Sequence, residues 1–117
     1  MGSQGSGAFR PGMTTVRKEF ELSADVSAKL AELLHQVGET HHIVFADTDG
    51  SDDDWATFYS DWLLTHSELP RLLARRPIRS HLTRDLVELD EAYVKTSPSE
   101  PWPAWYAGQL VAKYGVA

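Results

Sequence analysis

The chain of 117 residues contains no cysteine. Disulfide bonds, thiol catalysis and thiolate metal ligands are therefore excluded. The sequence also lacks an apolar run long enough to cross a membrane and shows no secretory signal. We therefore expect a cytoplasmic protein with no membrane partner. The net charge of −6 argues against nucleic-acid binding.

The sequence also lacks the motifs of several common enzyme classes. It contains no G-x-S-x-G nucleophile motif, no P-loop and no dinucleotide-binding fingerprint. No two histidines have the His-x-x-x-His spacing, and the adjacent His41 and His42 would point in different directions on a helix or a strand. We therefore predict no cofactor, and only a divalent metal stays open.

One aromatic pattern occurs twice in the chain with the same spacing. Its members are Trp55, Phe58, Tyr59, Trp62 and Leu63 in the first copy, and Trp102, Trp105, Tyr106, Gln109 and Leu110 in the second. Two copies of one helical unit, about 26–66 and 74–114, explain this pattern. We predict an all-α single domain over 13–117, a four- to five-helix bundle built from these two units. Residues 1–12 are expected to be a cloning remnant or a disordered leader.

The first helix has clear start and stop signals. Ser23 is a favourable N-cap, apolar residues then follow helical spacing, and Gly38 is a typical C-terminal stop. Residues 16–22 are expected to form an extended arm or a brief strand. Residues 41–44 fit either a further helical turn or an extended segment.

Similar signals place the other helices. Ser51 with Asp54 resembles a capping box that opens the second helix. A third helical segment starts at Leu69, and Pro77 interrupts it before a long amphipathic helix. The last helix is expected to run from about Trp102 to Tyr114.

Features present in only one of the two copies are the better candidates for function. The first copy alone carries His41 and His42, followed by Asp47 and Asp49. A histidine oriented by a carboxylate can act as a general base. The same composition fits a buried histidine that ties the loop to the bundle, which is the more common arrangement.

The acidic turn also predicts a divalent-metal site with Asp47, Asp49 and Asp52 as ligands. An EF-hand is excluded, because alignment on Gly50 places Phe45 at the first ligand position, and the bidentate glutamate is missing. An irregular calcium or magnesium loop stays open.

The repeated aromatic residues are expected to be core. A ligand site formed by Trp55, Tyr59 and Tyr106 is the alternative. Charge is also unevenly distributed, with seven acids and no Lys or Arg over residues 39–61, and five arginines and no acid over residues 71–84. The arginines are expected to bind phosphate or an acidic partner, or to pair with the chain's own acids.

The chain resembles a group of small uncharacterised bacterial proteins. The residues that carry the resemblance are His41, His42, Phe45, Thr48, Asp49, Gly50, Asp52, Asp54, Trp55 and Tyr59, with Leu69-Pro70 and the Trp102–Ala107 segment downstream. Departures occur at Asp53 and Ala56, where that group commonly has proline, and at Phe58, where it has tryptophan. The resemblance implies a small helical fold and no particular chemistry.

Two functional classes follow from these observations. The first is a non-enzymatic accessory or binding module, which acts on a protein partner or a small ligand through the acidic His/Asp loop. The alternative is a small hydrolase or isomerase with His41 or His42 as base and Asp47 or Asp49 as its partner, with or without metal assistance. Monomer and homodimer are both compatible with the sequence.

Overall fold

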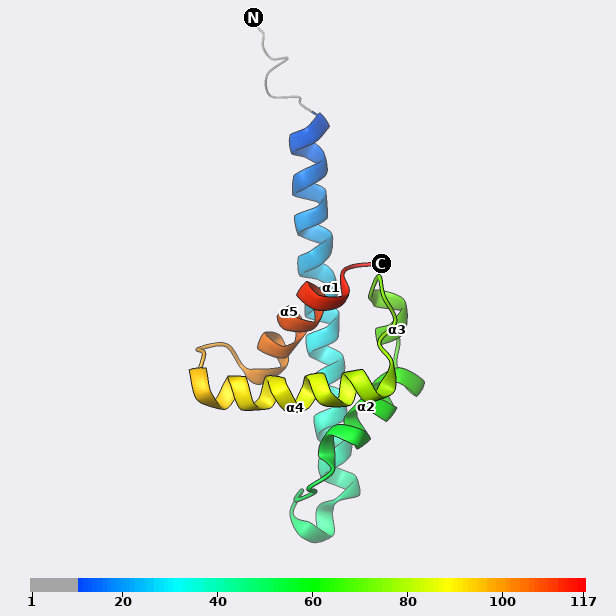
Figure 1. Ribbon diagram of the computed structural model, residues 1–117, viewed down its shortest axis with the longest axis vertical. Coiled ribbons are helices and arrows are strands. Elements are labelled where there is room, and N and C mark those ends of the chain that lie inside the picture. The colour runs from blue at the N-terminus through cyan, green and yellow to red at the C-terminus, as the bar shows by residue number, and fades with distance from the viewer. Residues whose placement is uncertain (1–10) are drawn as a thin grey trace, which may run out of the picture.

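The computed structural model describes the backbone of residues 11–117 and the side chains of residues 21–117. Residues 1–10, and with them most of the predicted leader, lie outside the described residues. The described chain is all-α, as predicted (Figure 1). Its helices are α1 (Pro11–Val44), the short 3-10 helix η1 (Ala46–Thr48), α2 (Trp55–Thr65), α3 (Leu69–Leu72), α4 (Arg79–Thr96) and α5 (Trp102–Tyr114).

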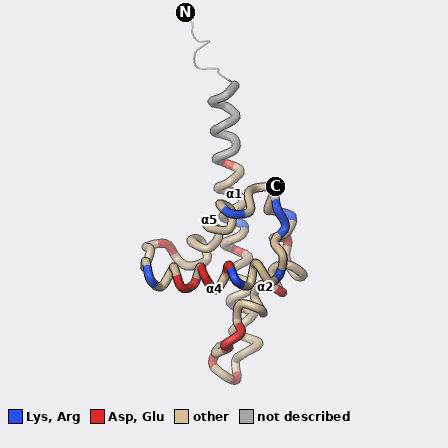
Figure 2. Tube along the Cα trace, in the orientation of Figure 1, with Lys and Arg blue, Asp and Glu red and all other residues tan. Residues whose placement is uncertain are grey.

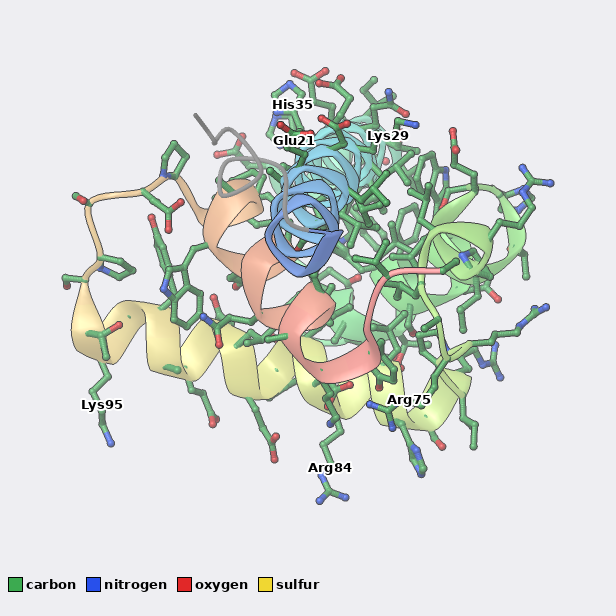
Figure 3. The ribbon with its side chains drawn as sticks, turned by 90° about the horizontal axis from the view of Figure 1, so that it is seen from above. Glu21, Lys29, His35, Arg75, Arg84 and Lys95 are labelled. Carbon is green, nitrogen blue, oxygen red and sulfur yellow. The ribbon has the colours of Figure 1, made fainter. Side chains whose placement is uncertain are left out.

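The helices form three layers. α2 and α5 each contact α1 on one side and α4 on the other, so they lie between these two helices. Figure 1 shows α1 as the long upright helix with α4 running across it, and Figure 3, seen from above, shows α5 between α1 and α4. This arrangement brings the N-terminal ends of α2 and α5 close to the second half of α4.

The core is built mainly from leucine. Replacing one such side chain by alanine typically costs about 2–5 kcal/mol, so these residues dominate the stability of the fold. The largest fully buried apolar side chains come from all five α-helices: Leu30, Leu34, Val37, Leu63, Leu69, Leu82, Leu86 and Leu110. A polar contact also joins α2 to α4, where the Ser60 and Thr83 hydroxyls lie 2.6 Å apart.

The first helix is longer than the sequence signals predicted. The expected arm at residues 16–22 is helical, and α1 continues through Gly38 to Val44. Residues 13–37 contain neither glycine nor proline, so nothing in the sequence interrupts the helix at Ser23. Gly38 is not a cap, because the helix continues six residues beyond it. A Cβ atom there would lie 3.3 Å from the Trp102 ring and 3.4 Å from the Tyr59 hydroxyl. Gly38 permits the close approach of two aromatic side chains.

The capping box predicted at Ser51 is absent. α2 begins at Trp55, four residues later, and no side chain caps its N-terminus. Instead, the Asp54 backbone N–H donates to Asp52 Oδ1 at 3.0 Å, and the Thr57 hydroxyl donates to Asp54 Oδ1 at 2.6 Å. By contrast, α5 has the predicted bounds, and Pro103 lies in its first turn.

The C-terminal tail fixes the linker between α3 and α4. Val116 forms an isolated antiparallel bridge with Leu73, and the Ala74 N–H donates to the Gly115 carbonyl at 2.9 Å. Pro77 is buried within this linker, but α3 ends at Leu72, five residues before the proline that was predicted to interrupt it. No described helix is long and apolar enough to cross a membrane.

Charged side chains lie mostly on the outer surfaces. Figure 2 shows acids around the loop between α1 and α2 and basic residues on the linker before α4. Figure 3 shows Arg84 and Lys95 pointing away from the body on the outer side of α4. One arginine of the basic stretch pairs with the acidic stretch, since Arg79 lies 3.3 Å from Asp61, with both side chains at least half exposed.

Candidate functional site

An aromatic pocket opens where α2, α4 and α5 meet. It has a volume of about 390 Å³, within the range typical of small-ligand sites. α2 contributes residues from its first turns, α5 does the same, and α4 contributes its second half. The lining residues of this aromatic pocket are Trp55, Tyr59, Asp90, Tyr93, Val94, Trp102 and Tyr106.

Neighbouring rings in the pocket meet edge to face. Trp55 and Tyr59 have ring centroids 5.1 Å apart with planes at 80°, and Trp102 and Tyr106 lie 5.0 Å apart at 64°. Tyr59 and Trp102 join the two pairs at 6.2 Å and 45°. Tyr93 continues the series against Tyr106 at 6.1 Å and 76°. Tilted and edge-to-face contacts are the arrangements that aromatic pairs prefer.

Among residues 21–117, Asp90 is the only carboxylate that lines the aromatic pocket. The Tyr106 hydroxyl donates to its Oδ1 at 3.2 Å. Burial, and to a lesser extent the nearby Asp90 charge, raises the pKa of the phenols of Tyr59 and Tyr106 above the ordinary value. Both phenols therefore stay protonated at neutral pH, while the carboxylate supplies the negative charge of the pocket.

A second cavity, here called the α1 cavity, lies on the other side of Tyr59 and Trp102. Its volume is about 580 Å³, and its remaining walls come from the last turns of α1. These walls are His35, Gly38, Glu39, His42 and Ile43. The two cavities share Tyr59 and Trp102 as wall residues.

His41, the buried histidine beside the loop between α1 and α2, lines neither cavity. The side chain of His41 is 7% exposed, and its Nε2 lies 3.0 Å from Asp52 Oδ2. A carboxylate only accepts hydrogen bonds, so Nε2–H is the donor. The ring stacks on Phe45 with centroids 4.6 Å apart and meets the edges of Phe58 and Tyr59.

This bond also changes the acidity of Asp52. The hydrogen bond from His41, and then that from the Asp54 backbone N–H, lower the pKa of the Asp52 carboxyl below its usual value. The arrangement fixes the acidic loop to the end of α1. It matches the structural role that the sequence allowed for one histidine, and it pairs His41 with Asp52 rather than with Asp47 or Asp49.

The remaining loop acids are exposed. Asp47 lies in η1, and Asp49 follows it in the left-handed conformation, with φ at 58°. Over residues 21–117, no group of three or more His, Asp or Glu side chains is arranged to hold a metal ion. The structure therefore does not preassemble the predicted site from Asp47, Asp49 and Asp52, and metal binding there stays a prediction.

His42, the other candidate base, is exposed at the rim of the α1 cavity. Its Nδ1 would lie 2.8 Å from a Cβ atom on Gly50. The described hydrogen bonds and ion pairs give it no carboxylate partner. The enzymatic alternative thus has no described base with both a carboxylate partner and a cavity.

The structure brings Trp55, Tyr59 and Tyr106, the three aromatic residues of the predicted ligand site, into one pocket. The sequence interpretation missed Asp90. A signal was present, because Asp90 lies four residues after Leu86 and three before Tyr93, on the edge of the apolar stripe of its helix. An acid at such a position faces partly inward.

Comparisons of the chain with protein-family models, with curated proteins and with solved structures gave no match. The case for function therefore depends on the geometry of the aromatic pocket.

Proposed function

We propose that this protein is a non-enzymatic binding module whose ligand occupies the aromatic pocket. The observation that carries the proposal is the convergence of five aromatic rings and one carboxylate on a cavity of about 390 Å³. Ligand sites typically combine mainly apolar walls with a few polar groups that set orientation. Asp90 and the Tyr106 hydroxyl supply those groups here.

This proposal moves the binding function from the acidic loop to the recess beside it. The loop contributes indirectly, because His41 holds it against the end of α1 and also contacts Tyr59. Tyr59 in turn forms a wall of the pocket. The contact with His41 therefore helps to fix the position of Tyr59 in the wall of the pocket.

Nuclear magnetic resonance provides a direct test. The protein has four tryptophans, and the indole N–H signals of Trp55 and Trp102 report on the pocket, whereas Trp62 serves as an internal control outside it. A library of small amines, acids and neutral ring compounds would be screened by saturation transfer, followed by mapping of the indole shifts. We expect selective shifts at Trp55 and Trp102.

Two variants of α2 sharpen the test. Trp55→Phe removes part of a pocket wall, while Trp62→Phe makes the same change outside the pocket, seven residues further along the same helix. Only the first is expected to weaken binding. Shifts confined to the loop over residues 47–54, or no bound compound in the whole library, would refute the proposal.

A further inference from the structure

The charge of the pocket is unbalanced. The described ion pairs engage five acids, namely Glu39, Asp52, Asp61, Asp85 and Glu88. Asp90 is in none of them, so within residues 21–117 it has no cationic partner. Its described hydrogen bond, from Tyr106, engages Oδ1 only. A half-buried carboxylate in an aromatic recess therefore faces the cavity without a counter-charge.

We propose that the ligand of the aromatic pocket is an organic cation with an alkylated ammonium headgroup. This inference rests on the proposed function and specifies the chemistry of its ligand. Aromatic rings attract cations through the negative potential of their faces, and Trp is the strongest ring in this respect, followed by Tyr and Phe. Trp55, Tyr59, Trp102 and Tyr106 supply two tryptophans and two tyrosines around one carboxylate.

The hydrogen-bonding capacity of the pocket selects between kinds of cation. A primary ammonium has three N–H donors, and a guanidinium has five, all of which need acceptors when they leave water. Asp90 is the one carboxylate of the pocket, and Tyr106 already uses part of its capacity. An alkylated ammonium carries few or no N–H donors and is weakly hydrated, so contact with ring faces replaces its water at little cost.

The size of the pocket agrees with this class of ligand. A volume of about 390 Å³ lies near the lower end of the range of small-ligand sites. It suits a headgroup with a short chain. The apolar side chains of Val94 and Ile43, which are 69% and 74% exposed, line the two cavities on either side.

The test compares a cation with its neutral isostere. Choline would be titrated against the uncharged analogue in which a quaternary carbon replaces the nitrogen, with indole N–H shifts and calorimetry as readouts. The two molecules have nearly the same shape, so a difference between their Kd values measures the effect of the positive charge on affinity. We expect choline to bind about tenfold more tightly than the analogue.

Two variants of α4 test the role of the carboxylate. Asp90→Asn removes the charge but keeps an acceptor for the Tyr106 hydroxyl, and we expect it to weaken choline binding about tenfold while leaving the analogue unchanged. Glu91→Gln removes the same charge from the adjacent, exposed residue outside the pocket and is expected to leave both Kd values unchanged. Circular dichroism verifies that each variant folds.

The outcomes separate this inference from the proposed function. Equal binding of choline and its analogue would overturn the cation assignment and leave the binding module standing. Binding of neither, together with an empty library screen, would overturn both. A peptide with trimethyllysine distinguishes the two sources of the headgroup. Tighter binding of the peptide than of choline places the cation on a protein, and tighter binding of choline assigns a free small molecule.

Discussion

The His41 imidazole and the Asp52 carboxylate are joined across the loop between α1 and α2, with Nε2 and Oδ2 3.0 Å apart. The two residues are eleven positions apart and both side chains are mostly buried. Their bond holds the segment before α2 against the last turn of α1. It therefore influences the position of Trp55, the first residue of α2 and a wall of the pocket.

Replacing Asp52 is expected to give a pH-dependent loss of stability. The pKa of Asp52 is lowered in the folded state, so its stabilising contribution is present above the unfolded-state value near 3.8 and is lost as the pH falls through the folded-state value. Asp52→Asn should therefore be less stable than wild type at neutral pH and approach it in acid. Urea unfolding across this pH range measures the difference.

The adjacent Asp53 is exposed and provides the control. Asp53→Asn should follow the wild-type curve. If Asp52→Asn and wild type differed equally in acid and at neutral pH, the assigned role of the His41 bond would be wrong.

Gly50 is expected to tolerate no larger residue without loss of stability. Its φ is +84°, and an added Cβ would lie 2.8 Å from His42 Nδ1. We expect Gly50→Ala to lower the free energy of unfolding by about 1–2 kcal/mol. Gly108, which lies in α5 with open space around it, should behave oppositely, since alanine there favours the helix by about 1 kcal/mol. Chemical denaturation of the two variants gives both values.

The double variant Gly50→Ala/His42→Ala separates the two causes. Removal of the imidazole should restore only the part of the loss that comes from crowding, and the remainder measures the backbone strain. Equal stabilities for Gly50→Ala and wild type would contradict the left-handed conformation described for this turn.

A methyl group at Gly38 is expected to alter the pocket more than the fold. Its Cβ would lie 3.3 Å from Trp102 Cζ2, so the ring must shift by a few tenths of an ångström. The gain in helix propensity, about 1 kcal/mol, opposes the crowding. We expect Gly38→Ala to shift the Trp102 indole signal and to weaken ligand binding. An unchanged Trp102 signal would show that the contact with α1 is looser than described.

Tyr114 is expected to make the fold sensitive to alkali. Its hydroxyl donates to the buried Asp85 at 2.5 Å, and burial together with this bond raises the pKa of Tyr114. Because the folded-state pKa lies above the unfolded-state value near 10, the contribution is present below that pH and is lost as the pH rises.

Tyr114→Phe should therefore lower the free energy of unfolding by about 1–3 kcal/mol at neutral pH. The variant should also lose stability less steeply with rising pH, because the slope of the free energy of unfolding against pH falls by the contribution of one proton. The contributions of Tyr59 and Tyr106 to that slope remain. Urea unfolding above pH 10 provides the measurement. An alkaline slope identical to that of wild type would contradict the assignment.

The sequence was a good guide to helices whose ends have local signals. The bounds of α5 follow from Pro101, Pro103 and the apolar spacing up to Tyr114, and the structure confirms them. The end of α1 could not be predicted in this way. Gly38 resembles a helix stop, and only the packing of Trp102 against it shows that its small size is needed inside the helix.

Only the part of the site that depends on spacing along a single helix could be predicted from the sequence. Helical spacing groups Trp55 with Tyr59, but their meeting with Tyr106 depends on how α2 and α5 pack, which no local signal encodes. The comparison of the two sequence copies drew attention to residues unique to the first loop. It passed over Asp90, whose importance arises from the rings of other helices around it. The family resemblance and the relation between the two copies stay predictions.

The walls of the aromatic pocket come from three helices that span residues 55–114. No short fragment of the chain therefore contains the site, and a peptide with only α2 or only α5 would carry its rings without their partners. Any compound that occupies the pocket holds these helices together, so its binding energy adds to resistance against heat. The pocket also gives a measure of folding. Because its walls come from α2, α4 and α5, the rate at which ligand binding recovers during refolding would report how fast these three helices pack together.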